Sequence, residues 1–216
     1  AADVFYGTET LGPVGGPELQ PYYFNSDRTL SADTLYTLRG QVYFEEGTTL
    51  TIPAGTVIQG EPAGTIIIKQ GAQIFVNGTA EDPVVFTSSQ PAGLRTTGDW
   101  GGIVVLGRGP INLDPETTSI EGGIIEGTYG GDEEFDSSGV IKYCRLEFPG
   151  YRFEEGNEIN GLTMGGVGAG TELHHVQVSH SNDDAFEWFG GNVDAHHLVA
   201  IAALDEDFDV DEGYSG

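Results

Sequence analysis

Short apolar runs separated by glycine and proline corners are the dominant pattern along the 216 residues of the chain. Alternation of apolar and polar residues within many of these runs is typical of strands that bury one face. No stretch of ten or more residues shows the 3.6-residue apolar period of a helix, so the pattern predicts an all-β fold. We expect strands at 36–44, 48–52, 56–58, 65–69, 73–76, 84–87, 101–106, 120–126, 140–148 and 162–167.

Two segments, 172–193 and 194–215, repeat one another at an offset of 22 residues. The matching pairs are His174 with His196, His175 with His197, Asp183 with Asp205, Phe186 with Phe208, and Glu187 with Asp209. A period of this length, made of short strands and glycine corners, predicts a solenoid in which each coil stacks on the next. The predicted fold is a right-handed parallel β-helix over residues 31–216. Residues 1–30, rich in Gly, Pro and aromatics, are expected to form an extended arm with one strand around 22–24.

The register of the repeat sorts side chains into columns, because alternate residues of a strand point to opposite faces. The columns expected to point into the core contain Cys144, Val176 and Leu198, and Leu146, Val178 and Ala200. The columns expected to point outward contain Tyr143, His175 and His197, and Thr163, Glu187 and Asp209. Insertions at 88–99, 128–138 and 149–158 are expected to form loops at the corners of coils, where they leave the strand ladder undisturbed.

Thirty-four acidic residues against eight basic ones give the chain a formal net charge of −26. Nucleic acids and anionic membranes are poor partners for such a surface, since both are bound through clusters of Lys and Arg. No apolar run approaches the roughly 18 residues that cross a membrane, so no membrane insertion is expected. The chain opens with Ala-Ala rather than Met, and we expect an exported protein whose signal peptide has been removed. The single cysteine, Cys144, excludes an intramolecular disulfide.

The repeat also places acidic residues directly above one another. Carboxylates one coil apart, at about 4.8 Å, repel by roughly 3 kcal/mol at an effective dielectric near 20. Raised pKa values, exposure to water or a bound cation must offset this repulsion, and calcium suits sites made of carboxylate and carbonyl oxygens. The sequence therefore predicts a calcium site, with a solvated acidic edge as the alternative. The candidate ligands are Asp183, Asp184, Glu187, Asp205, Asp207, Asp209 and Asp211.

Three further motifs point less clearly to a ligand. Segment 207–213 has the alternating acids of an EF-hand loop, but its glycine arrives one position late and no helices are expected around it. The paired histidines at 174–175 and 196–197 have the ligand chemistry for zinc or copper, although identical stacked side chains in a solenoid are more often structural ladders. The glycine-rich segment 165–170 precedes no predicted helix and is interpreted as a corner between coils.

An enzymatic function is the alternative to a structural one. Segment 181–185 (SNDDA) resembles the paired-aspartate segment of polygalacturonase-type β-helix hydrolases, which use separated carboxylates as acid and base. The other signatures of these hydrolases are missing from the chain. A lyase-like reaction needs a basic residue beside bound calcium, and only Arg145 and Arg152 lie near enough in the sequence. The sequence therefore leans against catalysis, and keeps binding or cleavage of a polysaccharide as the alternative function.

Five segments have characteristic sequence motifs, among them 52–61 (IPAGTVIQGE) and 100–107 (WGGIVVLG); the others are 71–87, 158–168 and 183–191. Together they resemble a family of large exported bacterial β-helix proteins, often lipoproteins or surface proteins. The resemblance covers roughly residues 35–216, and it implies export and fold rather than a particular activity. We expect a non-enzymatic, extracellular or cell-surface structural protein, stabilised by calcium. Open β-helix ends recruit partners, so we also expect end-to-end assembly into filaments through these ends and the N-terminal arm.

Overall fold

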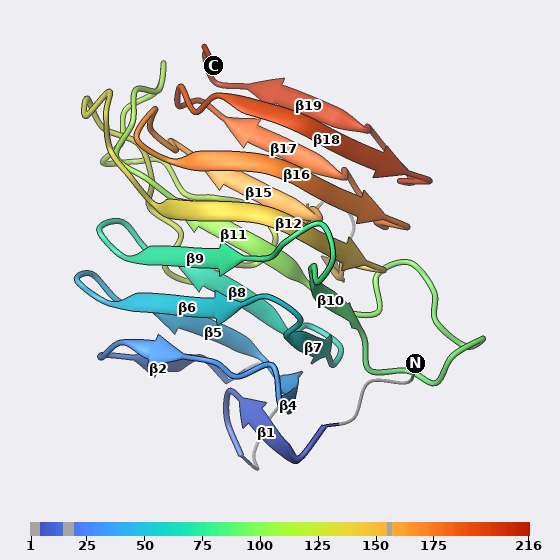
Figure 1. Ribbon diagram of the computed structural model, residues 1–216. Coiled ribbons are helices and arrows are strands. Elements are labelled where there is room, and N and C mark those ends of the chain that lie inside the picture. Colours follow the sequence, from blue (N-terminus) through green and yellow to red (C-terminus); the bar gives the residue numbers. More distant parts are fainter. Residues whose placement is uncertain (1–4, 15–19, 155–156) are drawn as a thin grey trace.

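The computed structural model describes residues 5–14, 20–154 and 157–216, whose strands coil upward around a common core (Figure 1). Within these residues every regular element is a strand, and only one strand pair is antiparallel. The chain therefore forms the right-handed parallel β-helix that the sequence predicts. No helix in the described ranges is long and apolar enough to cross a membrane.

Two parallel sheets form the walls of the β-helix in the described part of the chain. The first sheet contains β1 (Gly7–Leu11), β3 (Arg28–Thr29), β4 (Thr34–Leu38), β6 (Thr49–Pro53), β7 (Val57–Gly60), β9 (Gln73–Asn77), β10 (Val84–Ser88), β12 (Gly139–Glu147), β16 (Glu172–Ser179) and β18 (Ala195–Ile201). The second sheet contains β2 (Tyr22–Phe24), β5 (Gln41–Phe44), β8 (Thr65–Ile68), β11 (Gly102–Leu106), β15 (Leu162–Gly165), β17 (Phe186–Phe189) and β19 (Phe208–Asp211). A separate antiparallel hairpin consists of β13 (Arg152–Glu154) and β14 (Asn157–Glu158).

Coils of 22 residues occur near both ends of the described β-helix. Leu35 pairs with Val57, and His174 pairs with His196, each 22 residues further along the chain. This register confirms the repeat read from the sequence. The central coils are longer, because two insertions, 89–101 and 107–138, lie between paired strands β10 and β12.

Apolar side chains stacked coil upon coil fill the interior. One column through the second sheet consists of Val42, Ile66, Ile103, Leu162, Phe186 and Phe208. The predicted stacks of Cys144, Val176 and Leu198, and of Leu146, Val178 and Ala200, are both confirmed. Because each side chain rests on its counterpart in the next coil, repetition in register produces a continuous core.

Strands β12, β16 and β18 cross a bend at which earlier coils use two separate strands. Tyr143, His175 and His197 stand at this bend with φ values of 46°, 53° and 56°, a left-handed conformation that is uncommon for residues other than glycine. Their rings form the predicted outward column. The ring centroids of Tyr143 and His175 are 4.4 Å apart, and those of His175 and His197 are 4.3 Å apart.

The extended arm predicted for residues 1–30 is corrected by the structure, because its described part forms the first coil. β1 pairs with β4, β2 with β5, and β3 with β6. Tyr23 stacks on Tyr43 with ring centroids 5.1 Å apart, and Phe24 stacks on Phe44 at 4.8 Å. The strand predicted around 22–24 is confirmed as β2, and aromatic stacking supplies its contact with the second coil. Residues 1–4 and 15–19 of the predicted arm lie outside the described residues.

The strand predicted at 120–126 is wrong, because these residues belong to the loop 107–138 between β11 and β12. Ile120 and Ile124 of this loop pack against outward side chains of the second sheet, together with Ile159 from the segment before β15. The apolar spacing of the loop thus reflects packing on a sheet rather than pairing within one. This cover explains why strands β8 and β11 are buried on both faces.

Candidate metal centre

Carboxylates from two successive coils meet on the outer face of the second sheet. Glu187 lies on β17, and Asp209 pairs with it in register on β19. Asp183 and Asp184 come from the corner before β17, and Asp205 comes from the equivalent corner one coil later. Carboxylate oxygens of Asp184, Glu187 and Asp209 lie within 4.8 Å of one another, as do those of Asp183, Asp184 and Asp205. The structure therefore brings together five of the predicted ligands.

Two residues that the sequence did not predict complete this site: Glu121 comes from the loop 107–138, and Asn160 comes from the segment before β15. Asn160 Nδ2 donates to Glu121 Oε1 at 3.2 Å and also to Glu187 Oε2. Asn160 Oδ1 accepts a hydrogen bond from the backbone N–H of Asp184 at 3.2 Å. Glu121 reaches the site only through the fold of the loop 107–138, so no spacing in the sequence reveals it. We call the following residues the carboxylate cluster: Glu121, Asp183, Asp184, Glu187, Asp205 and Asp209.

Asp207 and Asp211, the other two predicted ligands, belong to neither group of converging carboxylates. Asp207 is exposed at the corner before β19, and Asp211 pairs with Phe189 at the end of that strand. Side chains two residues apart on a strand are separated by about 6.6 Å, which carries both residues away from Asp209. The structure therefore does not bring these two aspartates into the cluster.

Burial makes the carboxylate cluster unfavourable for ionised side chains. Glu187 is only 5% exposed and Asp184 only 6% exposed, because loops cover the outward column. Loss of hydration raises the pKa of Glu187, and the nearby Glu121 raises it further. Burial also raises the pKa of Asp184, and it raises the pKa of Asp183 to about 6. At neutral pH these carboxyls therefore need either protons or a positive ion.

Lysine and arginine do not supply that positive charge in the part of the chain that the structure describes. None of the ion pairs there involves the carboxylate cluster. Arg152 pairs instead with Glu158 at 2.8 Å, and Arg145 lies on the first sheet. Thr163 pairs with Glu187 in register one coil below, is 2% exposed, and has no hydrogen-bond partner at Oγ1. A cation would satisfy carboxylate and hydroxyl oxygens together.

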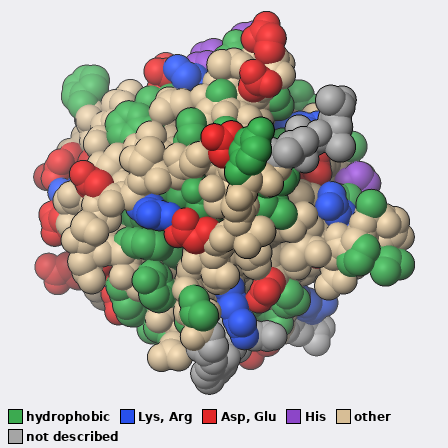
Figure 2. Space-filling model, turned by 60° about the horizontal axis from the view of Figure 1, so that its bottom comes forward, with side chains coloured by type: hydrophobic (Ala, Val, Ile, Leu, Met, Phe, Trp, Pro, Cys, Tyr) green, Lys and Arg blue, Asp and Glu red, His purple; other side chains and the backbone are tan. Residues whose placement is uncertain are grey.

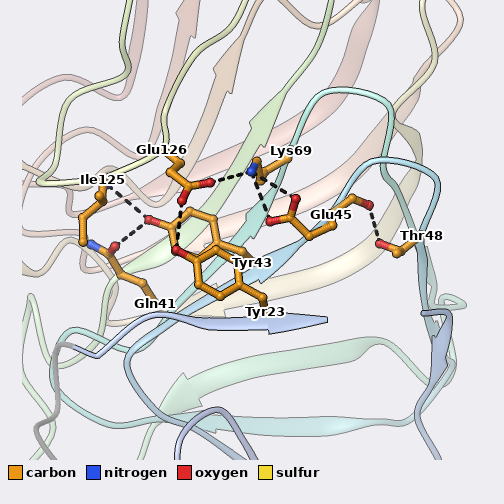
Figure 3. Close-up of polar contacts among 8 residues, drawn as sticks. All are labelled: Tyr23, Gln41, Tyr43, Glu45, Thr48, Lys69, Ile125 and Glu126. Carbon is orange, nitrogen blue, oxygen red and sulfur yellow. Dashed lines mark hydrogen bonds and ion pairs between the residues drawn. The ribbon is translucent and has the colours of Figure 1, made fainter. Parts of the chain in front are cut away.

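The lower part of the same outer face shows the opposite arrangement (Figure 3). Lys69 Nζ lies 2.6 Å from Glu126 Oε2 and 3.1 Å from Glu45 Oε1. The hydroxyl of Tyr23 donates to Glu126 Oε1 at 3.0 Å. Hydrogen bonds from Lys69 and Tyr23 lower the pKa of Glu126. We call Tyr23, Glu45, Lys69 and Glu126 the lysine network.

Comparison with known families decides the classification of the chain. The family described as a pectate-lyase-like β-helix domain matches residues 23–216. The chain belongs to this family. No curated protein and no solved structure matches the chain. The match to the pectate-lyase-like family begins within β2, so it includes part of the first coil as well as the carboxylate cluster.

Proposed function

We propose that this pectate-lyase-like β-helix domain is a non-enzymatic structural domain that binds Ca²⁺ at the carboxylate cluster. One observation carries the proposal. Asp184, Glu187 and Asp209 place carboxylate oxygens within 4.8 Å of one another, and no lysine or arginine of the described residues pairs with them. Calcium accepts six to eight oxygen ligands in a flexible geometry, which suits side chains gathered from two coils and a loop.

The ion's role would be to fasten the covering loop to the coil. Glu121 belongs to the loop 107–138, whereas Glu187 and Asp209 belong to the sheet beneath it. A bound Ca²⁺ would lower the pKa of Glu187 and return it to its ionised form, because a nearby opposite charge favours the carboxylate. Extracellular calcium modules bind the ion with Kd values of about 10⁻⁴–10⁻³ M. A site of this class fits the exported surface protein that the sequence predicts.

A thermal melt with calcium and with chelator tests the proposal. A ligand present at 100 times its Kd stabilises the folded state by about 2.7 kcal/mol. For a chain of this size, that stabilisation raises Tm by about 5–10 °C. The double variant D184N/E187Q should lose this increase, whereas the matched variant D207N, outside the cluster, should keep it. An identical Tm for the unmodified chain in calcium and in chelator would rule out the structural calcium site.

Binding or cleavage of an acidic polysaccharide is the second candidate function, and the family's description favours it. Asp205 is exposed and Asp183 is partly exposed, so a calcium ion held at this edge would have coordination positions open to a sugar carboxylate. Arg152, paired with Glu158 at 2.8 Å, is the basic residue placed nearest in sequence to act as a base there. Incubation with polygalacturonate and calcium, followed by calorimetry and absorbance of the unsaturated product, separates this function from the structural one.

Export and end-to-end assembly stay predictions of the sequence. Val199, Ile201, Phe208 and Val210 on the last described coil are 44–56% exposed. A second copy of the chain, or a further coil of a longer one, would cover these apolar side chains. Sedimentation velocity over a range of concentrations measures assembly of the chain, and a monomer throughout would contradict it.

A further inference from the structure

Four histidines converge on the first sheet, apart from the carboxylate cluster on the second. His174 and His196 pair in register on β16 and β18, and their rings stack in parallel with centroids 5.0 Å apart. His175 and His197 stack in the same way at 4.3 Å. Within each strand the two neighbouring rings meet through their Nδ1 atoms, 2.7 Å apart in the lower pair and 2.6 Å apart in the upper pair. We call these four residues the histidine group.

The bend in the strands explains how neighbouring residues meet. Consecutive side chains of a regular strand point to opposite faces. His175 and His197 have positive φ values of 53° and 56°, and this left-handed turn brings each ring edge-on to the ring before it. The ring planes of His174 and His175 are 83° apart, and those of His196 and His197 are 77° apart. The four Nδ1 atoms therefore face one another in two close pairs.

A carboxylate orients the first of these rings. His174 Nε2 lies 2.9 Å from Glu172 Oε1, and Lys142 Nζ lies 3.2 Å from the same oxygen. The carboxylate can only accept, so His174 donates from Nε2, and its Nδ1 carries a lone pair that accepts from His175 Nδ1 in the metal-free chain. Metal-binding histidines commonly donate their other ring N–H to a carboxylate in this way. Glu172 thus prepares His174 Nδ1 as a ligand atom.

We propose that His174, His175, His196 and His197 bind one zinc or copper(II) ion through their Nδ1 atoms. Ligand nitrogens of His175, His196 and His197 already lie within 4.8 Å of one another. Imidazole nitrogen suits both metals. Nitrogens bound at about 2.0 Å around a tetrahedral ion lie about 3.3 Å apart. To reach this geometry the rings would rotate so that each Nδ1 pair opens and the two pairs approach, and the exposed rings of His196 and His197 leave a path for the ion.

The proposal is independent of the calcium site. Calcium prefers oxygen ligands, whereas the histidine group offers only imidazole nitrogen. The two sites also use different sheets. Zinc or copper binding should therefore persist in a variant such as E187Q that has lost its response to calcium, and the failure of either site leaves the other intact.

Calorimetric titration of the metal-free chain with zinc, in excess calcium, tests the histidine site. The variant H175N/H197N removes two ligands and keeps residues that tolerate positive φ. The matched control is H180N, because His180 also has a positive φ of 58° and stacks on Phe148, outside the group. We expect one zinc ion bound by the unmodified chain and by H180N, and at least about a 100-fold weaker affinity in H175N/H197N. Glu172→Gln should weaken zinc binding by about 10–100-fold.

Electron paramagnetic resonance of the copper(II) form adds a direct view of the ligands. Nitrogen hyperfine structure should be present in the unmodified chain and in H180N, and reduced in H175N/H197N. If H175N/H197N does not fold by circular dichroism, H174Q/H196Q provides the same comparison on residues in ordinary strand conformation. Absence of zinc binding by the unmodified chain, a zinc affinity in the double variant equal to that of the unmodified chain, or a copper spectrum with oxygen ligands alone would overturn the proposal. Either of the last two results would leave the stacked rings as a structural ladder.

Discussion

Two glutamates of one covering loop are attached to the β-helix in opposite ways. Glu126 of the loop 107–138 meets Lys69, which lowers the pKa of this carboxyl. Glu121, five residues earlier, meets the buried Glu187 and raises the pKa of that carboxyl. Both contacts lie on the outer face of the second sheet. The contact of Glu126 is an ion pair between two side chains of the protein. The contact of Glu121 is with other carboxylates, which lack a basic partner among the described residues.

This difference shows how a chain with eight basic and thirty-four acidic residues distributes its positive charge. On the face that carries the first coils, single basic side chains lie beside acidic ones (Figure 2), as in the pairs of Arg28 with Glu9 and Arg39 with Glu61. The carboxylate cluster, higher in the β-helix, has no such neighbour in the described structure. Attachment of the loop should therefore be independent of calcium at Glu126 and dependent on it at Glu121.

Replacement of glutamate by glutamine should have opposite effects on stability at the two contacts. In calcium-free buffer at pH 7, Glu187→Gln should raise the free energy of unfolding by about 1–3 kcal/mol, because a neutral amide avoids the cost of burying or protonating the carboxylate. Glu126→Gln should lower it by up to about 1 kcal/mol, the usual range for a partly exposed ion pair. Chemical denaturation measures both values. Changes of the same sign in the unfolding free energies of the two variants would contradict the opposite roles of Glu187 and Glu126.

Acid should also separate the two regions, because their carboxyls are shifted in opposite directions. The pKa of Asp183 is raised from 3.8 to about 6 by burial, so folding favours its protonated form. The unfolding free energy of the calcium-free protein should rise by about 1–2 kcal/mol as the pH falls from about 6 towards 4. Glu126, with a pKa below its ordinary 4.5, contributes stability above that pH, and this stability is lost on further acidification.

Urea denaturation between pH 7 and pH 3 measures this profile. Asp183→Asn should flatten the rise between pH 6 and pH 4, and saturating calcium should remove it. A stability that falls steadily from pH 7 would show that the cluster is not strained by its own charge.

Removal of the ammonium group of Lys69 should leave the lysine network, like the carboxylate cluster, with carboxylates that lack a basic partner in the ranges that the structure describes. Lys69→Met keeps the apolar stem but leaves Glu45 and Glu126 without their ammonium partner, so we expect a loss of about 1–2 kcal/mol. Lys142→Met is the matched control, because Lys142 pairs with the more exposed Glu172 and should lose less than about 0.5 kcal/mol. Equal losses in the two variants, measured by thermal melting, would argue against a special role for Lys69.

The smallest expected effect concerns the hydroxyl of Tyr23. Tyr23→Phe removes one hydrogen bond to Glu126 and should cost about 0.5–1.5 kcal/mol, less than the loss of Lys69. Tyr22→Phe, one residue earlier on a ring that is 39% exposed, should change the melting temperature little. If the two variants have the same melting temperature, the hydroxyl of Tyr23 does not stabilise the attachment of the loop.

The sequence by itself determined the repeating part of this protein. The 22-residue offset correctly predicted that His174 pairs with His196 and that Glu187 pairs with Asp209. Such pairs can be predicted because each coil of a solenoid contacts only its neighbours, so the order along the chain fixes the order in space. The same offset correctly predicted that Asp183 and Asp205 lie close together.

Only the tertiary structure decided what the insertions and irregular residues do. Glu121 joined the carboxylate cluster, Asn160 came into contact with it, and Glu187 became buried, because segments outside the repeat fold over the sheet. The sequence indicated the strand at 22–24 of the first coil but not its pairing with the next coil, which depends on aromatic stacking. Paired histidines could be read from the sequence, but the contact of their Nδ1 atoms required the left-handed bend at His175. Loop packing and backbone bends depend on contacts between distant residues, which a local period does not record.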